Sequence, residues 1–122
     1  MKAPFRARAV AAALAACIPA AAGAAGRAET GLASYYRDEL HGRPTASGQL
    51  YDRSRLTCAH RSHPFGAMLE VVNLENGRKV QVMVNDRGPY GRGRVVDLSR
   101  EAARRLGMLK RGTARVRVAR VT

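Results

Sequence analysis

The sequence is poor in cysteine, in long apolar runs and in acidic residues, and each shortage narrows the fold classes or binding partners that are possible. It has two cysteines, Cys17 and Cys58, and a disulfide between them would tie the N-terminal segment to the body. We therefore expect the fold to stand without a disulfide. The N-terminal apolar run covers only residues 9–16, which is too short to cross a bilayer as a helix. This lack of long apolar runs argues against a transmembrane bundle. The sequence also has no internal repeat, which argues against a repeat array.

Acidic residues are the third shortage, with nine against 22 basic residues and a formal net charge of +13. The basic residues are spread along the chain rather than collected in one tail. Such a balance suits binding to an anionic polymer, and it also suits a solvated basic surface. Because the N-terminus indicates export, we expect no nucleic-acid partner. Binding to an anionic polymer through charge alone stays an alternative, and it predicts strong salt sensitivity without sugar preference.

The N-terminal segment has the layout of a secretory signal peptide. Lys2, Arg6 and Arg8 form a basic start, and the apolar run and small residues follow. Residues 14–17 read Leu-Ala-Ala-Cys, which resembles a bacterial lipobox whose cysteine is acylated. We predict a signal peptide over 1–16, lipidation of Cys17 and a flexible Ala/Gly tether over 17–29.

Export can also end in cleavage after Ala22 or Ala24, which both follow a small-x-small pattern. That route gives a soluble periplasmic protein. The prediction is an exported periplasmic monomer, held at the outer or cell membrane by the acyl chains on Cys17.

The body, residues 30–122, alternates apolar and polar residues in short segments. Asn76-Gly77 between two such segments is a strong hairpin signal, and Val80, Val82 and Val84 alternate with polar neighbours. Six strands without a βαβ rhythm predict a mainly β fold, a small barrel. The expected strands are 30–36, 57–59, 68–74, 79–84, 94–97 and 113–121.

One helix is predicted after the Asp97-Leu98-Ser99 turn. Ser99 is a good N-cap, Glu101 lies in the first turn where the helix dipole favours an acid, and Gly107 ends the helix. A further short helical turn is expected near 52–54, with Asp52 as its cap.

Two carboxylates, Asp86 and Asp97, bracket a loop rich in glycine and proline. A partly shielded carboxyl group at a strand end suits general acid catalysis, and a carboxylate pair is the minimum for ordinary glycoside hydrolysis. The alternatives are structural: Asp86 caps its own loop, and Asp97 satisfies backbone donors at the helix start.

Other reactive groups carry weaker patterns. Ser47 lacks a nucleophile-elbow context, and Cys58 is most simply a small buried residue despite the nearby His60. His60 and His63, three residues apart, are rarely brought together by a strand or turn, His41 is distant in sequence, and no carboxylate completes a ligand set. We therefore predict no metal site and no cofactor.

The tyrosines lie in or next to polar loops, where exposed rings suit stacking against sugars, although some of them are equally suited to the core. These residues are Tyr35, Tyr36, Tyr51 and Tyr90.

An ordered set of motifs resembles the RlpA (rare lipoprotein A) family over residues 30–122. The resemblance implies a double-psi β-barrel, related to the barrel of expansins. The motifs are 31–36 (Gly-Leu-Ala-Ser-Tyr-Tyr), 41–48 (His-Gly-Arg-Pro-Thr-Ala-Ser-Gly), 56–60 (Leu-Thr-Cys-Ala-His), 64–66 (Pro-Phe-Gly), 84–90 (Val-Asn-Asp-Arg-Gly-Pro-Tyr) and 97–99 (Asp-Leu-Ser).

The resemblance also implies an activity. RlpA is an exported lipoprotein and an endolytic lytic transglycosylase of peptidoglycan. It cleaves between N-acetylmuramic acid and N-acetylglucosamine in naked glycan strands without stem peptides, and leaves 1,6-anhydromuramoyl ends. By this resemblance Asp86 is the catalytic acid and base, and His60 is a second essential residue. The resemblance also implies that Thr45 and Asp97 line the substrate groove. We further predict Tyr90, Tyr36 and Gln49 as substrate-binding residues.

The sequence departs from the family pattern at three positions: Gln49 stands where Glu is usual, Cys58 where Ala is usual and His63 where Leu is usual. We expect no C-terminal peptidoglycan-binding (SPOR) domain of the kind that longer relatives carry, so septal targeting is not part of the prediction. The loss of a carboxylate at Gln49 leaves an alternative function, a non-catalytic, expansin-like module that binds peptidoglycan.

Overall fold

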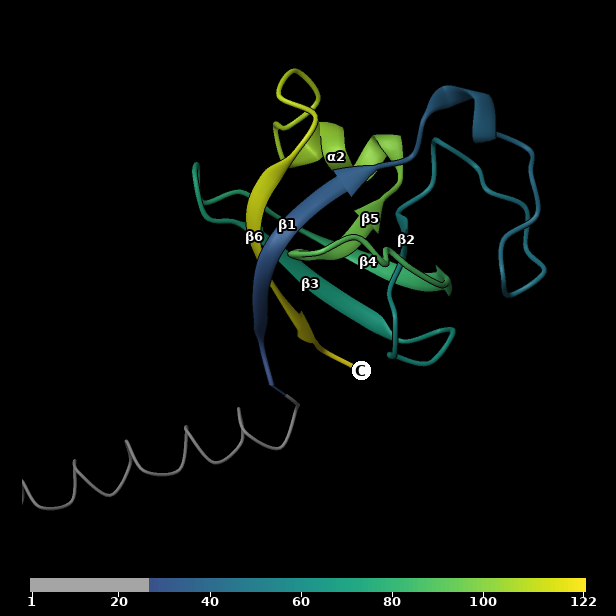
Figure 1. Cartoon of the computed structure of the whole chain (residues 1–122), viewed down its shortest axis with the longest axis horizontal. Helices are drawn as coiled ribbons and strands as arrows, with labels where there is room; N and C mark the ends of the chain where they lie inside the picture. Colours follow the sequence, from purple (N-terminus) through teal and green to yellow (C-terminus); the bar gives the residue numbers. More distant parts are fainter. Residues whose placement is uncertain (1–26) are drawn as a thin grey trace, which may run out of the picture.

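The computed structural model describes residues 27–122, in which six strands close into a barrel (Figure 1). Around the barrel the strand order is β1-β5-β2-β4-β3-β6. The strands are β1 (Glu29–Tyr35), β2 (Thr57–Ala59), β3 (Met68–Asn73), β4 (Lys79–Asp86), β5 (Arg94–Leu98) and β6 (Ala114–Arg120). The helices are the 3₁₀ turn η1 (Asp38–Leu40) and the α-helix α2 (Arg100–Arg105).

The predicted strands and the double-psi β-barrel class are confirmed, and in β3, β4 and β6 the alternation seen in the sequence matches the buried face of the strand. Along β4, Val80, Val82 and Val84 are buried, and along β6 the buried residues are Ala114, Val116 and Val118. These side chains meet Leu69, Val71, Val96 and Leu98 inside the barrel. The Asn-Gly pair turns β3 into β4 as expected, with Gly77 at φ 78°.

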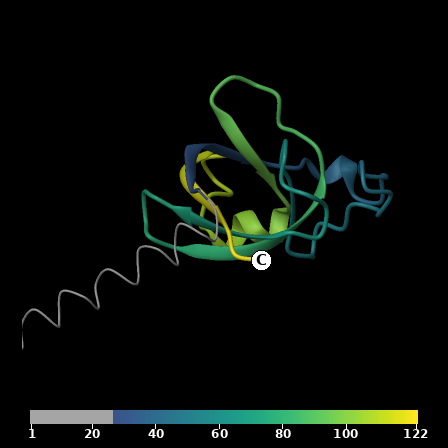
Figure 2. The same ribbon diagram turned by 90° about the horizontal axis from the view of Figure 1, so that it is seen from below.

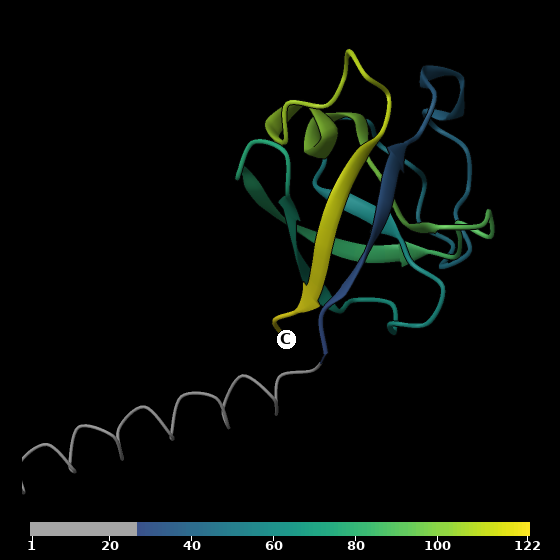
Figure 3. The same ribbon diagram turned by 60° about the vertical axis from the view of Figure 1, so that its left-hand side comes forward.

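The barrel includes two parallel strand pairs, β1 with β5 and β2 with β4. The short strand β2 lies between β4 and β5, and β1 lies beside β6 (Figure 3). Glycine is required where β1 passes β5, because a Cβ atom on Gly31 would lie 2.5 Å from Cγ1 of Val95 and 2.9 Å from the carbonyl oxygen of Gly93.

Helix α2 packs across one end of the barrel and has the predicted caps. The Ser99 hydroxyl accepts a hydrogen bond from the Ala102 N–H, and Gly107 follows the helix with φ 72°. Ala102 and Ala103 are buried against the core, together with Leu106. Within residues 27–122 no helix has the length and apolar character needed to cross a membrane.

Three local predictions are wrong. Residues 52–54 form a turn rather than a helix, because the Asp52 carboxylate accepts the Ser54 N–H directly. A 3₁₀ turn, η1, interrupts the segment 37–48 that was expected to be a loop. Strand β4 continues past Val84 to Asp86, because β2 pairs with it there.

At the N-terminus, β1 begins at Glu29, one residue inside the predicted tether. The predicted signal peptide, Cys17 and the tether up to residue 26 lie outside the described residues, so these predictions stay predictions.

Candidate active site

Strand β2 places the two aspartates of the sequence analysis on either side of one residue. Ala59 is the register partner of Asp86 in β4 and of Asp97 in β5. The pairing with β4 shifts between Cys58 and Ala59, so that one extra β4 residue, Asn85, lies in a bulge just before Asp86. Register partners on neighbouring strands direct their side chains to the same face of a sheet. The carboxylates of Asp86 and Asp97 therefore point to the same face of the sheet. Val96 and Leu98, the neighbours of Asp97 in β5, face the core.

The Asp86 carboxylate is held by donors from three segments of the chain. Its Oδ1 accepts the backbone N–H of Ala46 at 2.8 Å and that of Arg87 at 2.9 Å. Its Oδ2 accepts the hydroxyl of Tyr36 at 2.5 Å. The loop that carries Thr45 and Ala46 is thus brought to the end of β4, and this segment projects from the barrel (Figure 2). The predicted loop-capping role of Asp86 accounts for only one of these three contacts, the one with Arg87.

Tyr36 is fixed by its own neighbours. Its ring stacks on Tyr51 with centroids 4.4 Å apart, and the Tyr51 hydroxyl accepts the N–H of Arg100 at the start of α2. Burial, and then the hydrogen bond to Asp86, raise the pKa of the Tyr36 phenol far above its usual value. The phenol therefore stays protonated at neutral pH and acts as a donor to the carboxylate.

Asp97 has a different environment from Asp86. It accepts the hydroxyl of Ser34, and Nη1 of Arg94 donates to the same Ser34 oxygen at 3.1 Å. Helix α2 is capped by Ser99 instead, so the alternative that Asp97 satisfies the helix start is wrong. Its charge still contributes to the raised pKa of the Tyr36 phenol, as the charge of Asp86 does.

His60 is buried, and both of its ring nitrogens are bonded to groups other than the Asp86 carboxylate. Nδ1 accepts the N–H groups of Ser62 and His63 at 3.1 and 3.2 Å, so the neutral ring carries its proton on Nε2. Nε2 then donates to the Glu29 carboxylate. Within residues 27–122 the hydrogen bond between His60 and Asp86 themselves is a backbone one, in which the His60 N–H donates to the Asp86 carbonyl at 3.1 Å.

Arg87 is a residue of this region that the sequence reasoning missed. Its Nη1 donates to the carbonyl oxygens of His60 and His63, at 3.2 and 2.8 Å, and its guanidinium lies 4.1 Å from the centre of the Phe65 ring. The side chain next to Asp86 therefore ties the 60–65 turn to the end of β4.

Glu29 was missed as well, because it was assigned to the tether and its partner His60 is 31 residues away. The only sequence signal was its place directly before the first strand.

The remaining predicted residues are Thr45 and Gln49, in the loop whose Ala46 contacts Asp86, and Tyr90. The Thr45 hydroxyl donates to the carbonyl of Gln49 at 2.7 Å, and the Gln49 side chain accepts from Nδ2 of Asn85 at 3.2 Å. Tyr90 is 74% exposed in the 87–93 loop.

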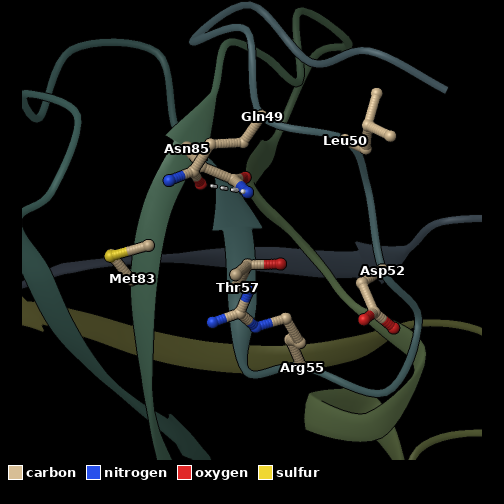
Figure 4. A pocket seen from close by; sticks show the side chains of 7 residues that line it. All are labelled: Gln49, Leu50, Asp52, Arg55, Thr57, Met83 and Asn85. Carbon is tan, nitrogen blue, oxygen red and sulfur yellow. Dashed lines mark hydrogen bonds between the residues drawn. The ribbon is translucent and has the colours of Figure 1, made fainter. Parts of the chain in front are cut away.

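A cavity of about 350 Å³ lies next to Asn85, the residue before Asp86 in β4 (Figure 4). Gln49 and Asn85 form one end of it, and Asp86 does not line it. The lining residues are Gln49, Leu50, Asp52, Arg55, Thr57, Met83 and Asn85.

Cys58 is buried in the core, as expected. Burial raises the pKa of its thiol, and the nearby Asp97 charge acts in the same direction. A thiol that stays protonated and buried is a poor nucleophile.

The premise for excluding a metal site was wrong, because a carboxylate does join the histidines. Glu29, His60 and His63 each bring one potential ligand atom into a group whose members lie within 4.8 Å of one another.

Comparison with known proteins identifies the family. Residues 28–118 match the lytic transglycolase family. The chain belongs to this family. It is 52% identical over 88 residues to a probable endolytic peptidoglycan transglycosylase RlpA of Treponema pallidum (strain Nichols), a match that covers 72% of this chain and 28% of that protein. The predicted resemblance to RlpA is therefore confirmed.

The fold of this lytic transglycolase family member also occurs in solved structures. A Streptomyces papain inhibitor superposes with a TM-score of 0.64 at 29% identity, over 80% of this chain and 96% of the inhibitor. An expansin of Clavibacter michiganensis superposes with a TM-score of 0.62 at 26% identity, over 79% of this chain and 51% of the expansin. The chain spans about a third or less of the length of the curated relatives it matches first, which is 28% and 32% for two of them.

Proposed function

We propose that this protein is an endolytic lytic transglycosylase that cleaves peptidoglycan glycan strands, with Asp86 as the catalytic acid and base. The observation that carries the proposal is the Asp86 carboxyl group. It is partly exposed at the end of β4, and backbone N–H groups and a tyrosine hydroxyl set its orientation. Membership of the lytic transglycolase family supports the reaction class. The names of the relatives, which are endolytic peptidoglycan transglycosylases, support peptidoglycan as the substrate.

The reaction needs one carboxyl group that first gives and then takes a proton. The protonated Asp86 donates its proton to the glycosidic oxygen between N-acetylmuramic acid and N-acetylglucosamine, and the bond to the muramoyl anomeric carbon breaks. The muramoyl 6-hydroxyl then attacks that carbon and closes a 1,6-anhydro ring, while Asp86 takes the hydroxyl proton. Water is not consumed, so the second carboxylate of a hydrolase is not required.

The residues around Asp86 act in this proposal by positioning it. Tyr36 holds Oδ2, and the Ala46 and Arg87 amides hold Oδ1. His60 acts through the 60–63 turn and the Asp86 backbone rather than through contact with the sugar. Asp97 and Thr45 bind the glycan on either side of the acid, together with Gln49 and the exposed Tyr90.

The substrate of the proposal is a strand without stem peptides. Such strands carry a free lactyl carboxylate on each muramic acid. The formal net charge of +13 falls only to +10 when Lys2, Arg6 and Arg8 leave with the signal peptide, and this positive charge favours an anionic polymer. The expansin-like alternative keeps the binding and drops the cleavage.

The deciding experiment is digestion of amidase-stripped glycan strands, followed by mass analysis of the products. We expect fragments that end in 1,6-anhydromuramoyl groups, without matching reducing muramic acid ends. If the protein sediments with the strands and releases no such ends, the binding module is correct and the enzyme proposal fails.

Tyr36→Phe is expected to lower the cleavage rate by about 10-fold to 100-fold. It removes one hydrogen bond to a carboxylate, worth about 1.5–3 kcal/mol, and keeps the ring stack on Tyr51. The matched control is Tyr35→Phe, which removes the hydroxyl that donates to the Leu109 carbonyl. Initial rates of anhydro-end release measure both variants. Equal rates for wild type and Tyr36→Phe would remove Tyr36 from the site.

The proposed substrate requires export, and we propose that the protein is held at a membrane by acylation of Cys17. Labelling with a fatty-acid analogue is expected to mark the wild-type chain and not Cys17→Ser. A wild-type chain without label, shortened near Ala22 or Ala24, would show soluble export instead.

A further inference from the structure

The cavity next to Asn85 is lined by an arginine, Arg55, whose backbone is fixed and whose guanidinium is available. The Arg55 N–H donates to the Asp52 carbonyl at 3.1 Å, and the Arg55 carbonyl accepts the Ser99 hydroxyl. The side chain is exposed and lines the cavity. Within residues 27–122 no hydrogen bond or ion pair of the guanidinium is recorded. Arg55 therefore offers its full set of N–H donors to a ligand.

Thr57 adds a second polar group without a recorded partner. This residue is 7% exposed at the start of β2, and in the part of the chain that the structure describes its hydroxyl takes part in no recorded hydrogen bond. A buried hydroxyl without a partner is unfavourable, so we expect a ligand atom or a water molecule to complete it. Figure 4 shows Arg55 on one side of Thr57, and the bonded amides of Gln49 and Asn85 on the other.

The cavity also has apolar walls. Leu50 and Met83 line it, and Figure 4 shows them on opposite sides. Its volume of about 350 Å³ is within the range of small-molecule sites, which are mostly apolar and have a few convergent polar groups. These features fit a ligand that combines an anionic group with amide and methyl groups.

We propose that this cavity binds the free lactyl carboxylate of an N-acetylmuramoyl unit, and that Arg55 recognises it. A guanidinium and a carboxylate pair through two parallel N–H···O bonds. The acetamido group of the same sugar matches the amides of Gln49 and Asn85. A stem peptide converts the carboxylate into a neutral amide, which loses the charge that Arg55 pairs with. This inference rests on the proposed function, because its ligand is part of a glycan strand.

The position of the cavity connects it to the proposed reaction. Asn85 lines the cavity and Asp86 is the next residue, with Cα atoms of consecutive residues about 3.8 Å apart. The loop whose Ala46 N–H holds the Asp86 carboxylate also supplies Gln49 to the cavity. A muramoyl unit in the cavity is therefore close to the bond that Asp86 cleaves. Arg55 acts in this proposal on the choice of substrate and not on proton transfer.

Asp52 is the one carboxylate among the lining residues, and it opposes an anionic ligand. Its Oδ1 accepts the hydroxyl and the N–H of Ser54, at 2.7 and 2.9 Å, and these bonds lower the pKa of the carboxyl group. Asp52 is therefore charged at neutral pH. Figure 4 shows its carboxylate and the Arg55 guanidinium on different sides of the cavity. The Asp52 charge weakens the attraction for an anion but leaves the Arg55 N–H donors available.

The test is an NMR titration of the full chain with the disaccharide N-acetylglucosaminyl-N-acetylmuramic acid. Its lactyl carboxylate is free, and it has no bond that the proposed reaction cleaves. The lactyl methylamide of the same disaccharide is the uncharged ligand. We expect the acid to bind about tenfold more tightly than the amide, because the amide loses a charge-assisted pair. Arg55→Gln should bind both with equal affinity, and the acid should shift the signals of Thr57 and of the Gln49 and Asn85 side-chain amides.

Arg53→Gln is the matched control. It removes the same charge from an exposed side chain of the same turn that does not line the cavity, so it should keep the wild-type preference for the acid. Four results would overturn the proposal. They are no binding of the acid, equal affinity of the wild-type chain for acid and amide, a preference that survives in Arg55→Gln, and a preference lost in Arg53→Gln.

The titration also separates this proposal from the cleavage proposal. The disaccharide is not a substrate, so a chain that releases no 1,6-anhydromuramoyl ends from strands can still show the preference for the acid. Equal affinities in a chain that does cleave strands would reject the role of Arg55 and leave the reaction in place.

Discussion

Asp86→Asn abolishes the release of 1,6-anhydromuramoyl ends and leaves binding to glycan strands intact. The amide has the size of the carboxyl group, and its oxygen can still accept the Ala46 and Arg87 N–H groups. It has no acidic proton to give to the glycosidic oxygen. Loss of a general acid costs about 10²-fold to 10⁴-fold in rate.

Product release by mass analysis and co-sedimentation with stripped strands measure the two properties separately. The charge-matched control is Asp38→Asn, an exposed carboxylate paired with Arg100 at 3.7 Å, which should cleave at the wild-type rate. Cleavage by Asp86→Asn at the wild-type rate would move the acid elsewhere, with Asp97 as the next candidate. Loss of binding together with cleavage would make Asp86 a binding residue.

His60→Ala is expected to lower both stability and cleavage, because it removes the hydrogen-bond partner of three groups. The Ser62 and His63 N–H groups and the Glu29 carboxylate each lose a hydrogen bond, and a cavity replaces the ring. We expect the free energy of unfolding to fall by about 2–5 kcal/mol and cleavage to fall at least tenfold.

His60→Asn separates positioning from chemistry. Its side-chain oxygen can accept the Ser62 and His63 N–H groups as Nδ1 does, so the 60–63 turn and the Arg87 contacts are kept. We expect stability and cleavage to recover together in this variant. Denaturant unfolding and initial rates make the comparison. Recovery of stability without cleavage would mean that the imidazole itself takes part in the reaction.

The sequence alone predicted most of the barrel. All six strands were predicted within two residues at each end. The prediction is best founded for β3, β4 and β6, where one face lies on the core and the alternation follows it. Ser99 and Gly107 bounded the helix correctly, since caps are local interactions. The turn at 52–54 and the 3₁₀ turn at Asp38–Leu40 were missed, because short polar segments have no periodic pattern to read.

The candidate site was predicted only in part. Asp86, His60 and Tyr36 were named from motifs, but the motifs do not say which atoms meet. The sequence placed Asp86 two residues past the end of the predicted strand, whereas pairing with β2 makes it the last residue of β4. Glu29, Ser34 and Arg87 were absent from the predicted site, since their partners lie 24 to 63 residues away in the chain.

The sequence by itself determined the strands, the caps and the family, because periodicity, capping and ordered motifs are properties of neighbouring residues. The tertiary structure decided how the chemical groups are combined. Closure of the barrel puts β2 between β4 and β5, which aligns Asp86 and Asp97 on either side of Ala59. The same closure brings the start of β1 to the turn after β2, so that Glu29 meets His60 and His63. Such contacts depend on strand order and register, and no local pattern specifies either of them.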